Sequence, residues 1–149
     1  MGSPRNPHRR NMSDTPNVTL QSPLWAVGRR KNAVARARLI PGGGRMLINS
    51  RSLDEYFGGH ERYKSSVMEP LRLVKLLTNY DTFLTVMGGG VMGQAEAIRL
   101  ALSRAIIKLD PKLRSAFRKE GLLTRDYRMV ERKKSGQPKA RRRFQHSKR

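Results

Sequence analysis

The feature that most constrains the fold is a strand, a glycine turn and a helix that follow one another between residues 80 and 109. Residues 80–87 (YDTFLTVM) are rich in aromatic and β-branched side chains and contain no Gly or Pro, which is typical of a strand. The turn holds Gly88, Gly89, Gly90 and Gly93. Apolar residues then recur in steps of three and four, at Ala95, Ile98, Leu102, Ala105, Ile106 and Leu109. This periodicity predicts a helix with one apolar stripe.

The rest of this helix is polar, and its end is marked in the sequence. Arg99, Ser103, Arg104 and Lys108 stay off the apolar stripe. The helix is expected to stop at Asp110-Pro111, because proline disfavours a helical conformation at the residue before it.

The glycine turn matches G-x-G-x-x-G, which in a strand-turn-helix setting can bind a dinucleotide with its pyrophosphate at the helix N-terminus. A phosphate loop would need Lys and then Ser or Thr after its last glycine, and this chain has Gln94-Ala95 there. A dinucleotide site needs a second parallel strand that ends in an acid about twenty residues on. Asp110 has that offset but ends a helix. The sequence therefore favours a structural role for the glycines, as bare backbone where the strand packs tightly against the helix.

Charge is the outstanding feature of the composition. The 149 residues include 32 Lys and Arg against 11 Asp and Glu, a formal net charge of +21. So much like charge opposes compaction, and a polyanionic partner is the natural remedy.

Other features of the composition exclude several classes of function. There is no cysteine, so disulfides and thiolate sites are excluded. His8, His60 and His146 lie far apart in sequence, and no two acids are placed as an acid/base pair, so we expect no metal, no cofactor and no enzyme activity. No apolar run approaches the roughly 20 residues of a membrane span, and no segment has the apolar core of a secretory signal.

Residues 27–40 alternate between small apolar and basic side chains. Ala33, Ala35, Ala37 and Leu39 share one face of a strand, and Val34, Arg36, Arg38 and Ile40 share the other. One face is thus suited to burial and the other to phosphate. The turn at residues 41–44 (PGGG) and residues 45–48 predict a hairpin with this strand.

Three further helices are expected. Ser52 is a good cap for a short helix that ends before Gly58-Gly59, with Tyr56 and Phe57 in the core. A second helix is expected over residues 61–67, halted near Pro70, and it is followed by the apolar residues Leu71, Leu73, Val74, Leu76 and Leu77. A third follows Pro111, with Gly121 as its cap.

The last 22 residues change character. Residues 128–149 include ten Lys or Arg and one acid, a net charge of +9, with Gly136 and Pro138 breaking any regular element. Such a run has little to bury and much to repel, so it does not fold alone. Fully extended it spans on the order of 70 Å. Arginine pairs with phosphate bidentately, and Phe144 and His146 offer flat surfaces to unstacked bases.

Several segments resemble one known family. The pattern over residues 88–106, Gly88-Gly89-Gly90-x-x-Gly93-Gln94-x-x-Ala97-x-x-x-Ala101-x-Ser103-Arg104-Ala105-Ile106, resembles the signature of the universal family of small-subunit ribosomal protein nine. Residues 28–36 (GRRKNAVAR) are similar to its first strand, residues 123–126 and 130–134 to its tail entry, and residues 147–149 (SKR) to its terminus.

The resemblance implies a fold and a partner. The fold is a compact α+β domain, a four-stranded sheet with packed helices and a left-handed β-α-β crossover. The protein would be a structural constituent of the small-subunit head, on the 3′ major domain of 16S-type ribosomal RNA beside neighbouring head proteins. Its tail would thread to the peptidyl-site tRNA. Two departures from the family pattern bear on the path of the tail: Pro138 where the family commonly has Lys, and residues 144–146 (FQH) where it commonly has Pro-Gln-Phe/Tyr.

Site residues follow from charge and resemblance together. Contacts to ribosomal RNA are expected from Arg29, Arg30, Lys31, Arg36, Arg38, Arg104, Arg125, Arg128, Arg132, Lys133, Lys134, Lys139, Arg141, Arg142 and Arg143. Contacts to the anticodon stem-loop of the tRNA are expected from Ser147, Lys148 and Arg149.

The chain is accordingly divided into a disordered N-terminal extension (1–25), a ribosomal domain (26–127) and a basic tail (128–149). The composition of the extension is compatible with a transit peptide and with a basic ribosome-binding arm. Translation could start at Met1 or at Met12. A bacterial cytoplasm is the expected compartment, with a plastid as the alternative. Two other functions stay open: a phosphate-using enzyme built on the glycine turn, and a general nucleic-acid protein with equal affinity for duplex DNA.

Overall fold

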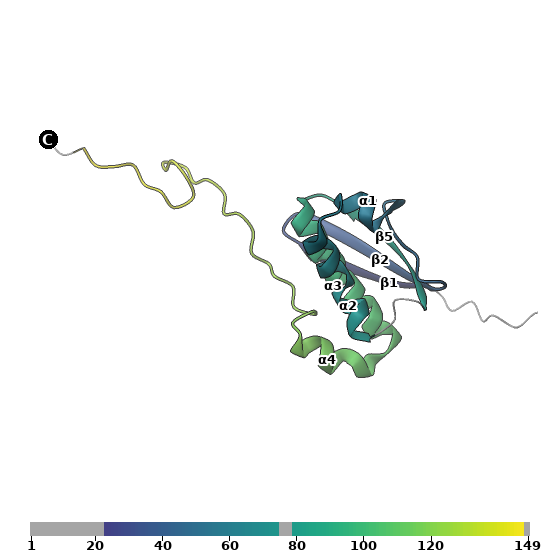
Figure 1. The fold of residues 1–149 in the computed structure, drawn as a ribbon. Coiled ribbons are helices and arrows are strands. Elements are labelled where there is room, and N and C mark those ends of the chain that lie inside the picture. The colour runs from purple at the N-terminus through teal and green to yellow at the C-terminus, as the bar shows by residue number, and fades with distance from the viewer. Residues whose placement is uncertain (1–22, 75–78, 148–149) are drawn as a thin grey trace, which may run out of the picture.

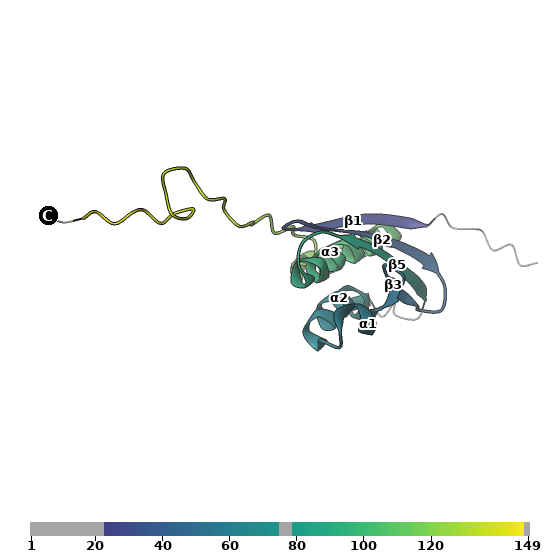
Figure 2. The same cartoon turned by 90° about the horizontal axis from the view of Figure 1, so that it is seen from above.

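A mixed sheet of five strands, in the order β1-β2-β5-β3-β4, runs through the protein. The computed structural model describes residues 23–74 and 79–147. Along the chain the elements are β1 (Leu24–Arg30), β2 (Ala33–Pro41), β3 (Met46–Ile48), β4 (Arg51–Ser52), α1 (Leu53–Phe57), α2 (Glu61–Val74), β5 (Tyr80–Met87), α3 (Val91–Leu109), the single 3-10 turn η1 (Pro111–Leu113) and α4 (Arg114–Lys119). The helices α1, α2 and α3 lie on one side of the sheet (Figures 1 and 2).

The first two strands form a hairpin that the sequence pattern did not predict. β1 and β2 pair antiparallel through a tight turn at Lys31 and Asn32, where Lys31 has φ 50°. The alternation of small and basic residues continues through this turn, and Lys31 is not a typical turn residue, so the pattern resembled one strand over residues 27–40. The hairpin predicted between that strand and residues 45–48 is wrong, because β3 does not pair with β2.

β3 instead runs parallel to β5, which lies between it and β2. The connection from β3 to β5 carries α1 and α2, which gives the β-α-β crossover that the resemblance implied. Past the end of β3, the side chain of Asn49 continues the pairing: its Nδ2 donates to Val86 O, and its Oδ1 accepts from Val86 N, both at 2.9 Å. The sheet has five strands rather than the expected four, since the two-residue β4 is added at its edge.

The helix α1 has the bounds predicted from the sequence, whereas α2 is longer than predicted. α1 begins after Ser52, whose hydroxyl accepts from Glu55 N, and ends at Gly58, which has φ 58°, as expected. Phe57 is buried, whereas Tyr56 is half-buried. α2 runs on through Pro70 to Val74 instead of stopping. Pro70 and its neighbour Leu71 are buried, and this packing favours a helix that proline alone would interrupt.

α3 follows the predicted bounds and forms the centre of the core. Its predicted apolar residues are buried, apart from a half-buried Leu109. Ser103 is also fully buried, contrary to the prediction, and its hydroxyl donates to the carbonyl of Arg99 at 2.8 Å. The buried surface is wider than one stripe, because α3 packs against β1 and β2 and also against α2. Ala97, Leu100 and Ala101 join the core for that reason.

The last helix ends where the sequence suggested. The N–H of Gly121 donates to Arg118 O at 3.1 Å, and the N–H of Leu122 donates to Phe117 O at 3.0 Å. With φ 69° at Gly121, this is the Schellman arrangement of a helix C-terminus. Phe117 and Leu122 are both buried and fix α4 to the domain.

The two ends of the chain differ in what can be described. β1 begins at Leu24, so the last two residues of the segment expected to be a disordered extension (1–25) belong to the sheet. Residues 1–22 of that segment lie outside the described residues, as do Leu76 and Leu77. Residues 124–147 contain no helix or strand. They first pass Arg30 of β1, which contacts Asp126 and Arg128, and then extend away from the domain (Figure 1).

Candidate nucleic-acid interface

The cations expected to contact RNA fall into three groups by position. Arg29, Arg36 and Arg38 lie on the outer face of the sheet, with Lys31 at the tip of the β1–β2 hairpin. Arg30 and Arg104 are engaged with other parts of the protein. The remaining predicted residues, from Arg125 onward, lie along the extended segment that leaves the domain.

The outer face owes its cations to the period of a strand. β2 buries Ala33, Ala35, Ala37 and Leu39 against the helices, so Arg36 and Arg38 point the opposite way. In the register of the hairpin, Val27 stands opposite Arg36 and Trp25 opposite Arg38. The guanidinium of Arg38 lies 5.4 Å from the centroid of the Trp25 ring, a cation–π contact. The outward face predicted from the alternation is therefore present, with Arg36 exposed and Arg38 half-buried.

Arg30 has a different surrounding from its neighbours. Its side chain is only 14% exposed, its Nε donates to a carboxylate oxygen of Glu96 on α3, and its NH2 lies 3.0 Å from Asp126 Oδ2. Its NH1 donates to the carbonyls of Asp126 at 3.3 Å and Arg128 at 3.1 Å. Arg30 thus joins β1, α3 and the first residues of the tail, and we call this cluster the tail anchor (Arg30, Glu96, Asp126 and Arg128).

The carboxylate of Asp126 is the centre of the tail anchor. It accepts from the backbone N–H of Arg128 at 2.9 Å and from the Nε and NH2 of the same residue. The side-chain hydrogen bonds from Arg128, followed by its backbone hydrogen bond, hold the pKa of Asp126 well below its ordinary value, and the charge of Arg30 adds to this effect. Asp126 therefore stays ionised throughout the physiological range.

Arg104 and Lys108 border the free edge of β1. Arg104 NH1 donates to the carbonyl of Val27 at 2.7 Å, and Lys108 Nζ donates to the carbonyl of Trp25 at 2.6 Å. Unpaired strand edges are templates for unwanted pairing, and charged side chains on the edge discourage it. The structure thus gives Arg104, expected to bind RNA, a role within the domain.

The tail itself is highly exposed and carries one local turn. Glu131 pairs with Lys134 at 2.7 Å and with Arg141 at 3.0 Å, which brings two tail segments together. The hydrogen bond from Lys134 is the main cause that lowers the pKa of Glu131, followed by that from Arg141. Arg132, Lys133, Lys139, Arg142 and Arg143 are all exposed. Ser147 is exposed as well, while Lys148 and Arg149 lie outside the described residues.

The glycines of the predicted turn are not equally constrained. A Cβ on Gly88 would lie 2.6 Å from Asn32 O, and one on Gly89 would lie 2.9 Å from Ala33 N, so the turn packs against the tip of the β1–β2 hairpin. Both have positive φ, 71° and 67°. Gly93 is buried, and a Cβ there would lie an ordinary 3.5 Å from the carbonyl oxygen of Arg30, whereas a Cβ on Gly90 would meet open space.

Among the glycines that the structure describes, Gly28 has the closest neighbours across a strand and a helix, whereas close packing was predicted at the glycine turn. A Cβ on Gly28 would lie 2.0 Å from the carbonyl oxygen of Ala97 and 2.5 Å from Ala101 N. The tight packing expected at the turn is therefore found between β1 and α3. Small residues on both elements, Gly28 against Ala97 and Ala101, were the available signal.

Gln94 explains why the turn is not a phosphate loop. Its Nε2 donates to the carbonyl of Gly88 at 3.1 Å, and its Oε1 accepts from the hydroxyl of Tyr56 at 2.9 Å. The position that follows the last glycine, where a phosphate loop carries lysine, is thus used to close the turn onto α1.

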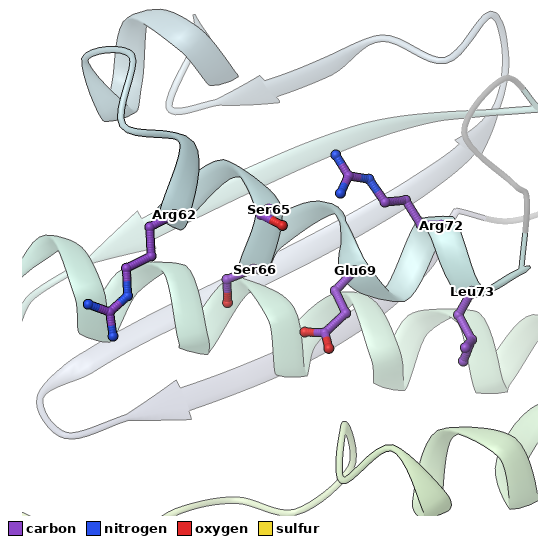
Figure 3. Close-up of a pocket in the computed structure, with 6 residues that line it drawn as sticks. All are labelled: Arg62, Ser65, Ser66, Glu69, Arg72 and Leu73. Carbon is purple, nitrogen blue, oxygen red and sulfur yellow. The ribbon is translucent and has the colours of Figure 1, made fainter.

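A shallow surface depression with a volume of about 680 Å³ lies on α2. It is lined by Arg62, Ser65, Ser66, Glu69, Arg72 and Leu73 (Figure 3). Arg62, Ser66, Glu69 and Leu73 point toward α3, while Ser65 and Arg72 point away from it. Glu69 is paired with Arg99 at 3.1 Å. The depression brings together no pair of groups suited to acid–base or nucleophilic chemistry.

The described residues hold no group of three or more His, Asp or Glu side chains that could bind a metal ion. Within residues 23–74 and 79–147, no helix has both the length and the apolar character to cross a membrane.

Comparison with known proteins agrees with the resemblance in the sequence. Residues 28–149 match the family described as Ribosomal protein S9/S16. The chain is 55% identical over 123 residues to the small ribosomal subunit protein uS9 of Anaeromyxobacter sp. (strain K), covering 83% of this chain and 94% of that protein. It is 53% identical over 133 residues to uS9 of Methylacidiphilum infernorum, covering 89% and 96%. It is 50% identical over 125 residues to uS9 of Maridesulfovibrio salexigens, covering 84% and 95%. This chain therefore belongs to the S9/S16 family of ribosomal proteins.

Proposed function

We propose that this protein is built into the head of the small ribosomal subunit, where its domain and tail bind 16S-type ribosomal RNA and the tail end reaches the anticodon stem-loop of peptidyl-site tRNA. Its family makes it a ribosomal protein, a structural component and not an enzyme. The relatives are named as small-subunit proteins, which supports the subunit. Membership also leads us to expect that the β3-to-β5 crossover is left-handed.

The observation that carries the proposal is the tail held at its root by the tail anchor. Charge repulsion within a segment of net charge +9 opposes its folding alone, and a polyanion removes that obstacle. The anchor fixes where the segment leaves the domain, so the tail is presented in one direction. The family match extends through residue 149, so the tail is part of the region that matches the family, which supports a family function for it.

The outer face of the sheet supplies a second group of cations. Arg29 and Arg36 are exposed, and Lys31 stands at the hairpin tip. We expect these side chains to contact RNA phosphates near the domain while the tail contacts RNA farther away. Phosphate contacts position a protein without reading sequence, so specificity would come from the shape of the folded RNA.

The compartment follows from the type of ribosome. The relatives are bacterial, which supports a bacterial-type ribosome in the cytoplasm. A plastid remains the alternative, and the mature N-terminus decides between them: a mature chain that begins beyond Met12 would indicate import, whereas one that begins at Met1 or Met12 would fit a start of translation without import.

The proposal is tested by purifying ribosomes under a high-salt wash that removes loosely bound proteins. We expect this protein to stay in the small-subunit fraction, and its absence from that fraction would overturn the proposal. In a second assay, the full-length protein is titrated with head-domain ribosomal RNA and with random duplex DNA at matched ionic strength. Equal affinity for both would indicate a general nucleic-acid protein instead.

The tRNA contact needs its own experiment. Small subunits are reconstituted with the full protein and with a variant that lacks residues 147–149. We expect normal incorporation of the truncated protein and weaker binding of tRNA in the peptidyl site. Unchanged tRNA affinity would remove the tail end from the proposed function and leave the RNA contacts standing.

A further inference from the structure

The outer face of the sheet carries aromatic side chains beside its arginines. Trp25 of β1 is 51% exposed and Phe83 of β5 is 37% exposed. The helices α1, α2 and α3 all lie on the opposite side of the sheet (Figure 2), so none of these three covers this face. Large aromatic side chains left in solvent on an open sheet are informative, because most such surface is buried in a monomer.

The register of the sheet places these side chains in one row. Trp25 stands opposite Arg38, and Arg38 stands opposite Phe83 on the next strand. The two rings are thus two strands apart, a separation of about 10 Å, with a guanidinium between them. One base cannot span that distance, so each ring would offer its surface to a different base.

The charge of this face distinguishes between the kinds of partner. Arg29, Arg36 and Arg38 all point outward, and the outward acid on the neighbouring β5, Asp81, accepts a hydrogen bond from the N–H of Arg45 at 2.8 Å. The centre of a protein–protein interface is usually depleted of charged residues. A nucleic acid has phosphates for the arginines and flat bases for the rings.

Arg38 has hydrogen-bonding capacity that the described residues do not use. Its Nε is buried and has no acceptor among them. The guanidinium is held in place by its contact with Trp25, so it is ordered before any partner arrives. Pre-ordering of this kind reduces the entropy lost on binding.

We propose that Trp25, Arg38 and Phe83 form a stacking surface that binds an unpaired segment of ribosomal RNA, with one base on each ring. The proposal rests on the proposed function and names the form of RNA that this face takes. Sheet faces with exposed aromatic residues bind single-stranded RNA in this way because every base has a flat surface to stack.

Trp25 is the only tryptophan of the chain, so its fluorescence reports directly on this surface. The full-length protein is titrated with a single-stranded RNA of about eight nucleotides and with an RNA duplex of the same length. The titration is made at about 0.3 M salt, where electrostatic binding by the tail is weakened. We expect the single strand to quench Trp25 and the duplex to leave it unchanged. Equal quenching by both, or none by either, would overturn the proposal.

Variants then separate stacking from charge. Phe83→Leu removes a ring from an exposed position, and we expect single-strand affinity, measured with labelled RNA, to fall on the order of 5- to 150-fold. Phe83→Tyr keeps the ring and should retain wild-type affinity. Circular dichroism confirms that both variants fold. Equal affinity of the two variants for the single strand would overturn the proposal.

Assembly distinguishes failure of this proposal from failure of the proposed function. A protein that enters the small subunit and binds head RNA, yet whose Trp25 responds only when neighbouring ribosomal proteins are added, would show that this face is a protein contact and would overturn the stacking surface alone. A protein absent from the subunit would overturn the proposed function itself.

Discussion

Arg30 and Asp126, 96 residues apart in the chain, form an ion pair of 3.0 Å that joins the first strand to the root of the tail. The side chain of Arg30 is directed inward, toward α3, whereas its neighbours Arg29 and Lys31 are exposed. Three consecutive cations thus divide into one that fixes the tail and two that remain open to a partner. The first two predictions concern the contact that fixes the tail.

The first prediction concerns the tail anchor. Replacing Asp126→Asn removes the carboxylate that Arg30 and Arg128 share, so the tail root should detach from β1. We expect faster trypsin cleavage after Arg125 and Arg128, with the melting temperature of the domain nearly unchanged. The matched control is Glu131→Gln, which breaks ion pairs inside the tail but none to the domain. Equal cleavage of wild type and Asp126→Asn would show that the anchor does not hold the tail.

The second prediction concerns pH. The pKa of Asp126 is depressed below its ordinary value of 3.8, so the anchor stabilises the folded arrangement fully above that value and loses its contribution as pH falls through the depressed pKa. The anchor should therefore be insensitive to pH between about 5 and 8. A carbon NMR titration of the Asp126 carboxyl group measures this directly. In Arg128→Gln the midpoint should rise toward the ordinary value, and a midpoint that is already ordinary in the wild type would contradict the assignment.

Local patterns in the sequence predicted local structure well, and the failures lie where distant residues decide. The strand at residues 80–87, the helix that ends before Asp110, and the cap at Ser52 depend on neighbours in the chain and are confirmed. The turn at Lys31 and the continuation of α2 through Pro70 depend on packing against other elements. Arg30 pairs with Glu96 and Asp126, which lie 66 and 96 residues away in the chain, and no spacing in the sequence marks these two pairings. Basic composition indicated an RNA partner but could not tell an anchoring arginine from an exposed one.

The third prediction concerns the close approach of β1 to α3. Gly28→Ala would place a Cβ 2.0 Å from the carbonyl oxygen of Ala97, so backbone must shift. We expect a loss of about 1–3 kcal/mol or more in the free energy of unfolding, measured by urea denaturation. Gly90→Ala is the control, because a Cβ there meets nothing within 4 Å and its φ of −102° suits alanine. It should change stability by less than about 1 kcal/mol. Similar losses in the two variants would argue against the packing described for Gly28.

The fourth prediction concerns Gln94, which connects the glycine turn to α1. Gln94→Ala removes the acceptor of the Tyr56 hydroxyl and the donor to the carbonyl of Gly88. These hydrogen bonds are partly buried or exposed, so we expect a loss of about 1–2 kcal/mol in the free energy of unfolding. Tyr56→Phe removes only one of the two hydrogen bonds and should cost less. A Gln94→Ala variant as stable as the wild type would mean that the turn is held by its glycines alone.

The fifth prediction concerns how exposed and engaged arginines differ in RNA binding. Arg142 and Arg143 are exposed in the tail, whereas Arg104 donates to the carbonyl of Val27 at 2.7 Å. Each lost phosphate contact reduces the dependence of log affinity on log salt by about 0.7 to 0.9. The double variant Arg142→Ala, Arg143→Ala should therefore reduce the slope for head-domain RNA by about 1.4 to 1.8. Arg104→Gln should leave the slope unchanged, since its guanidinium is directed to the edge of β1. A reduced slope in Arg104→Gln with none in the double variant would mean that RNA is bound by the domain edge and not by the tail.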